Sequence, residues 1–272
     1  MKLFTWALSS SRSGESPLAP SVLRKPGETV KRWVGGVVVP WLGAGLLLGS
    51  WHASGATVSV AAASSLRSSV GPLVEEFRRK HDGQYRVIYA ATGTLIQQLM
   101  HGAPYSVFLS ASSRYIEPLE RSGRICEGPT VIGHGRLVLY VPRLSKLRLD
   151  ATLESLAASP FRHLAIANPD IAPFGLLARQ ALQQAGVWEA IQQRLVFSES
   201  AASSARLALS GGVDAALLPE RLMSAPIFAK RGRWVRVDDD LYRPLPMMAV
   251  WICGGSVDSR SLYRFLVDRL VR

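Results

Sequence analysis

The sequence predicts an α/β fold of two lobes, each a sheet flanked by helices, with a ligand cleft between them. Short β-branched runs alternate with segments of helical periodicity, which is typical of parallel strands joined by crossover helices. The alternation stops at a polar connection over residues 142–152 and then begins again. The last strand and helix are expected to return to the first lobe. The chain would therefore cross between the lobes twice, and a ligand would bind in the hinged cleft.

The first lobe is predicted from residues 57–140 together with residues 247–272. A strand at 57–60 precedes a helix over 66–77, whose apolar residues recur at helical spacing. Ser64 is expected to cap the N-terminus of this helix. The other elements expected in this lobe are strands at 85–89, 106–111, 136–141 and 247–252, and helices at 94–101, 113–122 and 258–271.

The second lobe is predicted from residues 141–246. Pro169 and Pro173 bracket a loop that precedes its first helix, and Gly186 ends that helix. The elements expected in this lobe are strands at 164–167, 195–197, 213–218 and 234–237, and helices at 174–185 and 202–210.

Residues 1–56 are predicted to be an N-terminal extension and a signal peptide. The segment 34–50 carries no charge, follows Lys31 and Arg32, and is followed by small residues, which is the order of a secretory signal. We predict cleavage near Ala56 and a periplasmic location. An uncleaved membrane anchor is the alternative, but the apolar segment is short for a spanning helix and contains proline and glycine.

Charge and cysteine content exclude several kinds of partner. The whole chain has a formal net charge of +12, and the 26 basic and 18 acidic residues after position 56 leave +8. These charges are scattered and form no basic stripe with stacking aromatics, so no nucleic-acid partner is expected. The five histidines are dispersed and no Cys-x-x-Cys motif occurs, so no site for a free metal cation is expected. Cys126 and Cys253 could form a disulfide after export, but the sequence does not show that they meet.

Small residues and hydroxyls follow strand ends at several points of the chain. Ser64 and Thr92 lie where the first two predicted strands give way to helices. Segments 172–175 and 198–202 are comparable junctions in the second lobe. A helix start offers unpaired N–H donors and a partial positive charge, so it can hold an anion without a cationic side chain. The simpler interpretation of any one junction is an ordinary helix cap. Four of them indicate an exported binding protein for a small polar ligand.

Blocks of sequence in the same order and at similar spacing make the interpretation more specific. The chain resembles the periplasmic molybdate-binding proteins of bacterial ABC importers over most of residues 57–272. The blocks that carry the resemblance are 58–64, 89–95, 102–104, 108–111, 137–142, 172–175, 181–182, Gly186 and Trp188. The resemblance implies a type II periplasmic binding protein that closes its two lobes on molybdate or tungstate. It also implies a monomer that delivers the anion to a membrane ABC permease, with no cofactor and no enzyme activity.

The same resemblance implies the ligand-binding residues. Hydroxyl and N–H donors are expected from Ser64, a second hydroxyl from Thr92, and backbone N–H donors from Phe174 and Ala201. Ser65 is a possible further donor. Three departures from the family pattern stand out. Pro219 replaces a tyrosine that is a ligand in some relatives, Phe174 replaces a small residue, and serines replace acidic residues at 106 and 112.

Two rival functions follow from these departures and from the hydroxyls. The change at Pro219 leaves open a receptor of the same fold for sulfate, thiosulfate, phosphate or a small organic acid. A serine hydrolase is disfavoured, because the sequence has no Gly-x-Ser-x-Gly motif and no base predicted near Ser64.

Overall fold

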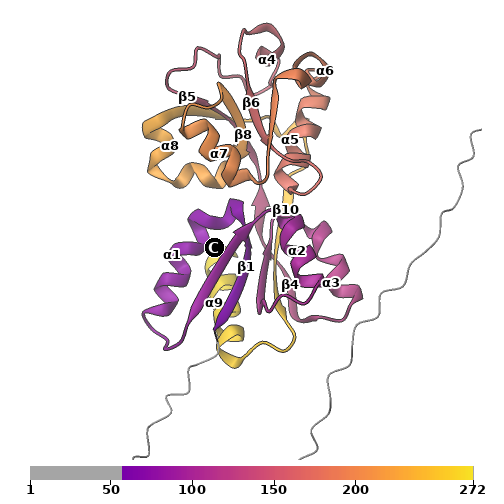
Figure 1. Cartoon of the computed structure of the whole chain (residues 1–272), viewed down its shortest axis with the longest axis vertical. Coiled ribbons are helices and arrows are strands. Elements are labelled where there is room, and N and C mark those ends of the chain that lie inside the picture. The colour runs from indigo at the N-terminus through magenta and orange to yellow at the C-terminus, as the bar shows by residue number, and fades with distance from the viewer. Residues whose placement is uncertain (1–56, 272) are drawn as a thin grey trace, which may run out of the picture. The chain divides into compact units, whose positions relative to one another are not determined.

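The computed structural model describes residues 57–271, which belong to one compact unit. Its strands form two five-stranded sheets, one in each lobe (Figure 1). Residues 1–56, with the predicted signal peptide and its cleavage site, lie outside the described residues. Among residues 57–271, no helix is both long and apolar enough to cross a bilayer.

The sheet of the first lobe has the order β2-β1-β3-β10-β4. Its strands are β1 (Val58–Ala63), β2 (Tyr85–Ala90), β3 (Val107–Ser110), β4 (Ile125–Gly135) and β10 (Leu245–Ile252). β1 is parallel to β2 and β3, whereas β10 is antiparallel to both β3 and β4. The prediction of parallel strands therefore holds for three strands of this sheet, and the sheet as a whole is mixed.

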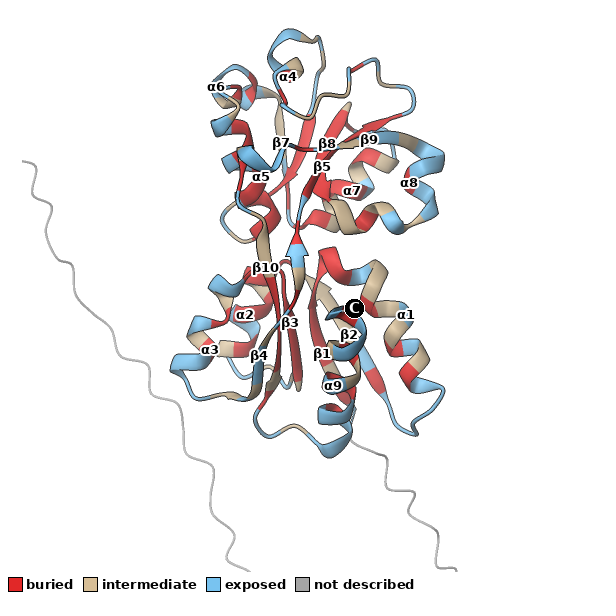
Figure 2. Cartoon of the chain, turned by 180° about the vertical axis from the view of Figure 1, so that it is seen from behind, coloured by how far each residue is buried: buried red, intermediate tan, exposed pale blue. Residues whose placement is uncertain are grey.

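Helices cover both faces of this sheet, which explains why its central strands are apolar at nearly every position. Val60 and Ala62 pack with α1 (Arg67–Arg78) and α9 (Val257–Val271), and the intervening Ala61 packs with α2 (Thr92–Met100) and α3 (Glu117–Arg121). Figure 2 shows the resulting buried strands between exposed helix surfaces. The short 3₁₀ turns of this lobe are η1 (Ser64–Leu66), which runs into α1, and η2 (Ser113–Tyr115).

The sheet of the second lobe has the order β7-β6-β8-β5-β9. Its strands are β5 (Leu137–Pro142), β6 (Leu164–Ala167), β7 (Leu195–Ser198), β8 (Ala215–Pro219) and β9 (Gly232–Arg236). β6 is parallel to β7 and β8, and β5 is antiparallel to β8 and β9. The helices and 3₁₀ turns are α4 (Ser155–Ala158), α5 (Pro173–Gln184), α6 (Trp188–Ile191), η3 (Gln192–Arg194), α7 (Ala201–Leu209), η4 (Glu220–Ser224), α8 (Pro226–Arg231) and η5 (Asp239–Leu241).

The predicted lobe boundary between residues 140 and 141 is wrong, because β5 belongs to the second sheet. The chain leaves the first lobe between Gly135, the last residue of β4, and Leu137, the first residue of β5. The error has a physical cause. β4 contains Pro129 and three glycines, a composition that predicts a loop, and its pairing with β10 is interrupted by register shifts. Without β4, the strand beginning at 136 was assigned to the first lobe.

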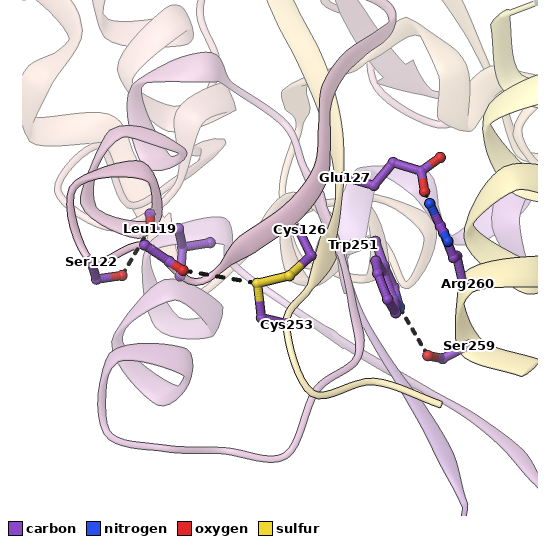
Figure 3. Close-up of a disulfide and its surroundings, with 9 residues drawn as sticks. Leu119, Ser122, Cys126, Glu127, Trp251, Cys253, Ser259 and Arg260 are labelled. Atoms are coloured by element: carbon purple, nitrogen blue, oxygen red, sulfur yellow. Dashed lines mark hydrogen bonds and ion pairs between the residues drawn. A yellow bond between two sulfur atoms is a disulfide. The ribbon is translucent and has the colours of Figure 1, made fainter. Parts of the chain in front are cut away.

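A disulfide joins Cys126 of β4 to Cys253, which follows β10, with an S–S distance of 2.06 Å (Figure 3). The pairing that the sequence left open is therefore present in the structure. Next to it, Trp251 donates from Nε1 to the hydroxyl of Ser259 at 3.0 Å, and Glu127 forms an ion pair with Arg260 (Figure 3). The disulfide fixes the edge strand β4 to its only sheet neighbour among the described strands.

Candidate functional site

A small cavity, with about 190 Å³ of space that is partly open to solvent, lies where the two lobes meet. All five residues predicted as ligand donors line it: Ser64, Ser65, Thr92, Phe174 and Ala201. The other lining residues are Ala63, Ala90, Ala91, Ala111, Ala172 and Pro173. They come from the ends of β1 and β2 in the first lobe, from the residue after β3, and from the starts of α5 and α7 in the second lobe. The structure thus brings the predicted junctions of both lobes to one place.

The two serines after β1 are buried, and neither caps the helix that follows. Ala63 occupies the N-cap position and no side chain bonds to the first turn, so the predicted capping role of Ser64 is wrong. The hydroxyl of Ser65 is buried and has no hydrogen-bond partner within residues 57–271. An unpaired buried hydroxyl costs about 1–3 kcal/mol, so such a group in a cavity wall favours a ligand that pairs with it.

Thr92, the first residue of α2, lines the cavity, and a hydrogen bond within the protein already orients its hydroxyl. Its Oγ1 accepts a hydrogen bond from the backbone N–H of Ala111 at 3.3 Å, and the side chain is almost completely buried. Accepting that bond leaves the hydroxyl hydrogen free to donate to a cavity ligand. Ala111 was not predicted as a contributor. Its place after a strand adjacent to β1 was the signal that could have identified it.

The second lobe contributes backbone donors. Phe174 is the second residue of α5, which begins with Pro173, and Ala201 is the first residue of α7. N–H groups in these positions have no acceptor within their own helix. At α7, the side chain of Ser200 caps the helix by accepting from the N–H of Ser203 at 3.3 Å. The serines around Ala201 are therefore structural, as the simpler interpretation of this junction predicted.

The lobes contact each other beside the cavity. The N–H of Gly93 in α2 donates to the carbonyl oxygen of Ile171, in the loop before α5, at 2.9 Å. A methyl group on Gly93 would lie 2.5 Å from that oxygen, so only glycine permits this approach. Ala91 packs against Ala167 and Ala172 in the same region. The cleft is closed in this structure, and small residues on both sides make the closure possible.

The cavity is electrically neutral in its side chains. Among the described residues, none of those lining it is charged, and no group of three or more histidine, cysteine, aspartate or glutamate residues is placed to bind a metal ion. Its polar groups are hydroxyls and N–H donors, which suit a ligand that only accepts hydrogen bonds. Burial raises the pKa of the nearby Tyr89, so this phenol is neutral at physiological pH and adds no negative charge next to the cavity.

Pro219, which the resemblance aligns with a tyrosine of some relatives, ends β8 and pairs with Leu137. It is not among the residues that line the cavity. Phe174 does line it, and its ring packs so closely on Gly135 at the lobe crossing that a methyl group there would lie 2.6 Å from the ring. The phenylalanine therefore closes one side of the cavity.

Comparison with known proteins places these features in a family. The sequence pattern of bacterial extracellular solute-binding proteins matches residues 58–269. The molybdate-binding protein ModA of Azotobacter vinelandii is 30% identical over 235 residues, which cover 84% of this chain and 89% of that protein. ModA of Rhodobacter capsulatus is 28% identical, with 64% and 67% covered.

The fold agrees with these sequence matches. The solved structure of the Azotobacter vinelandii periplasmic molybdate-binding protein superposes with a TM-score of 0.69 at 26% identity, covering 78% of this chain and 92% of that one. The two-lobed periplasmic binding protein fold is therefore confirmed, as is the resemblance that the sequence blocks indicated.

Proposed function

Because this chain belongs to the bacterial extracellular solute-binding protein family, we propose that it is a receptor for molybdate, with tungstate as an equivalent ligand. The observation that carries the proposal is the neutral, donor-lined cavity between the lobes, in which the Ser65 hydroxyl has no protein partner within residues 57–271. The choice of molybdate comes from the relatives, which are molybdate-binding proteins, and the neutral hydrogen-bond donors that line the cavity suit such an anion.

A tetrahedral dianion accepts hydrogen bonds at four oxygens and donates none. In the proposed complex, Ser64, Ser65 and Thr92 donate from their hydroxyls, and Phe174 and Ala201 donate from their backbone N–H groups. Each charge-assisted bond contributes roughly 1.5–3 kcal/mol, and a helix N-terminus adds about 0.3–1 kcal/mol. Together these donors offset the cost of removing the anion from water.

Selectivity would come from the size of the cavity. Molybdate and tungstate are nearly equal in size and charge, so the site should hardly separate them. Sulfate is smaller, so in a closed, rigid cavity some donors would lie beyond hydrogen-bond distance. The proline at 219 is the reason to include sulfate, thiosulfate and phosphate among the tested ligands.

The proposed receptor acts outside the cytoplasmic membrane, after signal cleavage near Ala56, and releases its anion to an ABC permease. We propose that it is a monomer and has no enzyme activity. In support of the latter, neither Ser64 nor Ser65 is hydrogen-bonded to a histidine or carboxylate within the described part of the chain. N-terminal sequencing of the exported protein would test the cleavage position.

Isothermal titration of the purified protein with molybdate, tungstate, sulfate and phosphate is the deciding experiment. We expect tight, nearly equal binding of the first two anions and much weaker binding of the others. A preference for sulfate or phosphate would identify a receptor of the same fold for that anion. The absence of binding heat with both molybdate and tungstate would reject the proposed function.

A further inference from the structure

A second cavity, with about 560 Å³ of space that is partly open to solvent, adjoins the proposed anion site and shares two lining residues with it. Ser65 and Phe174 line both cavities. The larger one differs in containing charged side chains, those of Arg136, Glu220 and Arg221, together with His134. The neutral cavity therefore adjoins a second cavity that contains basic side chains.

Arg136 and Glu220 of this second cavity each pair with a side chain of opposite charge, whereas Arg221 does not. Glu220 accepts from Nε of Arg236 at 2.9 Å, and Arg136 forms an ion pair with Asp239 at 3.5 Å. Arg221 is partly buried and makes no ion pair with any residue of 57–271. Burial lowers the pKa of Arg221, yet a guanidinium group stays protonated at neutral pH. Its positive charge thus lies in the cavity next to the anion site without an ion-pair partner in residues 57–271, since the nearby Glu220 is paired with Arg236.

Arg221 also connects the two lobes. It belongs to η4 of the second lobe, and its Nη1 donates to the hydroxyl of Ser69 on α1 of the first lobe at 3.4 Å. The hydroxyl of Ser68, also on α1, donates to the backbone carbonyl of Arg221 at 3.2 Å. A methyl group on Gly133 in β4 would lie 2.8 Å from Nη2, so that strand leaves room for the guanidinium. These contacts cross between the lobes in the closed structure.

We infer that Arg221 is a positioning residue that supplies the positive charge for lobe closure over a bound dianion. The inference rests on the proposed function. A buried dianion with only neutral donors around it is strongly attracted to a cation held in the same poorly hydrated region. Opening the cleft separates Arg221 from α1 and breaks its contacts there. Because the charge favours the liganded closed state, Arg221 couples binding of the anion to closure.

Three variants separate the charge of Arg221 from its packing. Arg221→Gln removes the charge and keeps an N–H donor for the Ser69 hydroxyl. Arg221→Lys keeps the charge but loses the planar guanidinium group with its several donors. Arg86→Gln is the control of matched charge, since Arg86 is exposed on β2 and does not line either cavity. Molybdate affinity is measured by titration, and the lysine variant separates charge from packing, because salt screens a partly buried charge only weakly. Melting temperatures check that each variant folds.

We expect Arg221→Gln to bind molybdate about ten-fold more weakly than the wild type. Arg221→Lys should keep most of the wild-type affinity, and Arg86→Gln should bind as the wild type does. Wild-type affinity in Arg221→Gln would overturn the inference. Equal losses of affinity in the glutamine and lysine variants would overturn it as well, because Arg221 would then act by packing alone. Failure of the wild type to bind molybdate or tungstate would instead reject the proposed function itself.

Discussion

The hydroxyl of Tyr242 accepts a hydrogen bond from the backbone N–H of Leu137 at 3.1 Å. Leu137 begins β5 just after the chain first crosses between the lobes, and Tyr242 lies shortly before β10, where the chain crosses back. The same hydroxyl donates to Oδ1 of Asp239 at 2.9 Å. One phenol therefore ties the two crossings of the hinge together.

The raised pKa of Tyr242 predicts that the folded protein loses stability at alkaline pH. Burial is the largest of the effects that together raise the pKa of Tyr242 to about 12; the hydrogen bond to Asp239 also raises it, and the hydrogen bond from the N–H of Leu137 opposes both. Because the pKa of Tyr242 is higher in the folded than in the unfolded state, the protonated phenol stabilises the fold. This contribution is complete below about pH 10 and is lost as the pH rises towards 12. The free energy of unfolding should fall by the order of 2 kcal/mol over that interval. Tyr242→Phe, followed by chemical denaturation at several pH values, should remove this contribution, and an unchanged pH profile in the variant would contradict the assignment.

Ser65→Ala should change stability and affinity in opposite directions. Because the hydroxyl of Ser65 is buried without a partner, its removal should leave the unliganded protein as stable or up to about 1 kcal/mol more stable. Molybdate affinity should fall, since one donor is lost. Calorimetric melting and titration measure the two effects. Ser204→Ala is the control, because its hydroxyl is bonded to Ser198 at 2.6 Å and its loss should destabilise the protein. A parallel loss of stability in both variants would show that Ser65 is only structural.

Thr92→Val removes a hydroxyl at nearly constant volume. Affinity for molybdate should fall by roughly 1–3 kcal/mol, because a ligand oxygen would face a methyl group. The melting temperature without ligand should change little, since the bond lost to Ala111 is long at 3.3 Å. Thr94→Val, in the same helix but outside the cavity lining, is the matched control for titration. Equal affinities in the two variants would remove Thr92 from the site.

Gly93→Ala should obstruct closure of the lobes. The added methyl group would lie 2.5 Å from the carbonyl oxygen of Ile171, and that backbone atom cannot move aside alone. Crowding of this kind costs about 1–3 kcal/mol, and it would appear as weaker binding and faster ligand release. Gly71→Ala is the control, because its methyl group would meet the hydroxyl oxygen of Tyr89 at an ordinary 3.6 Å. Stopped-flow release rates that are alike in both variants would exclude this role for Gly93.

Replacing both disulfide cysteines by serine should destabilise the protein by about 2–5 kcal/mol. The bond joins residues 127 positions apart, and so it restricts the unfolded chain strongly. Denaturant titration with and without a reducing agent measures the effect. The reductant should lower the stability of the wild type and leave the Cys126→Ser/Cys253→Ser variant unchanged. No difference between the two proteins would show that the disulfide does not contribute.

The cavity could be predicted from the sequence because its residues follow strand ends. β1 and β2 are parallel neighbours, so Ser64 and Thr92 emerge at the same edge of one sheet, and the same holds for β6 and β7 in the other. The longer helices were also predictable from apolar periodicity, whereas the short α4, α6 and α8 were not predicted; α5 begins at Pro173 and α7 at Ala201, each within one residue of its predicted start. Local patterns of this kind need no knowledge of distant contacts.

The remaining features depend on contacts between distant segments. β4 was missed because its Gly-Pro-rich sequence becomes a strand only through pairing with β10, more than a hundred residues later. The pairing of Cys126 with Cys253 follows from that same strand pair. Nor does any local pattern indicate that Gly93 meets Ile171, or that Arg221 meets Ser69. Such approaches are set by how the lobes close.

The two crossings also make the lobes inseparable in the polypeptide. Each sheet contains one antiparallel strand next to a crossing, β10 in the first lobe and β5 in the second, and the whole second lobe separates β10 from the other strands of its sheet. No single cut in residues 57–271 yields the first lobe as one intact fragment. A fragment ending before β10 would lack the strand that pairs with both β3 and β4. The first lobe can therefore fold completely only when nearly all of the described chain is available, so we expect the two halves of the binding site to form together.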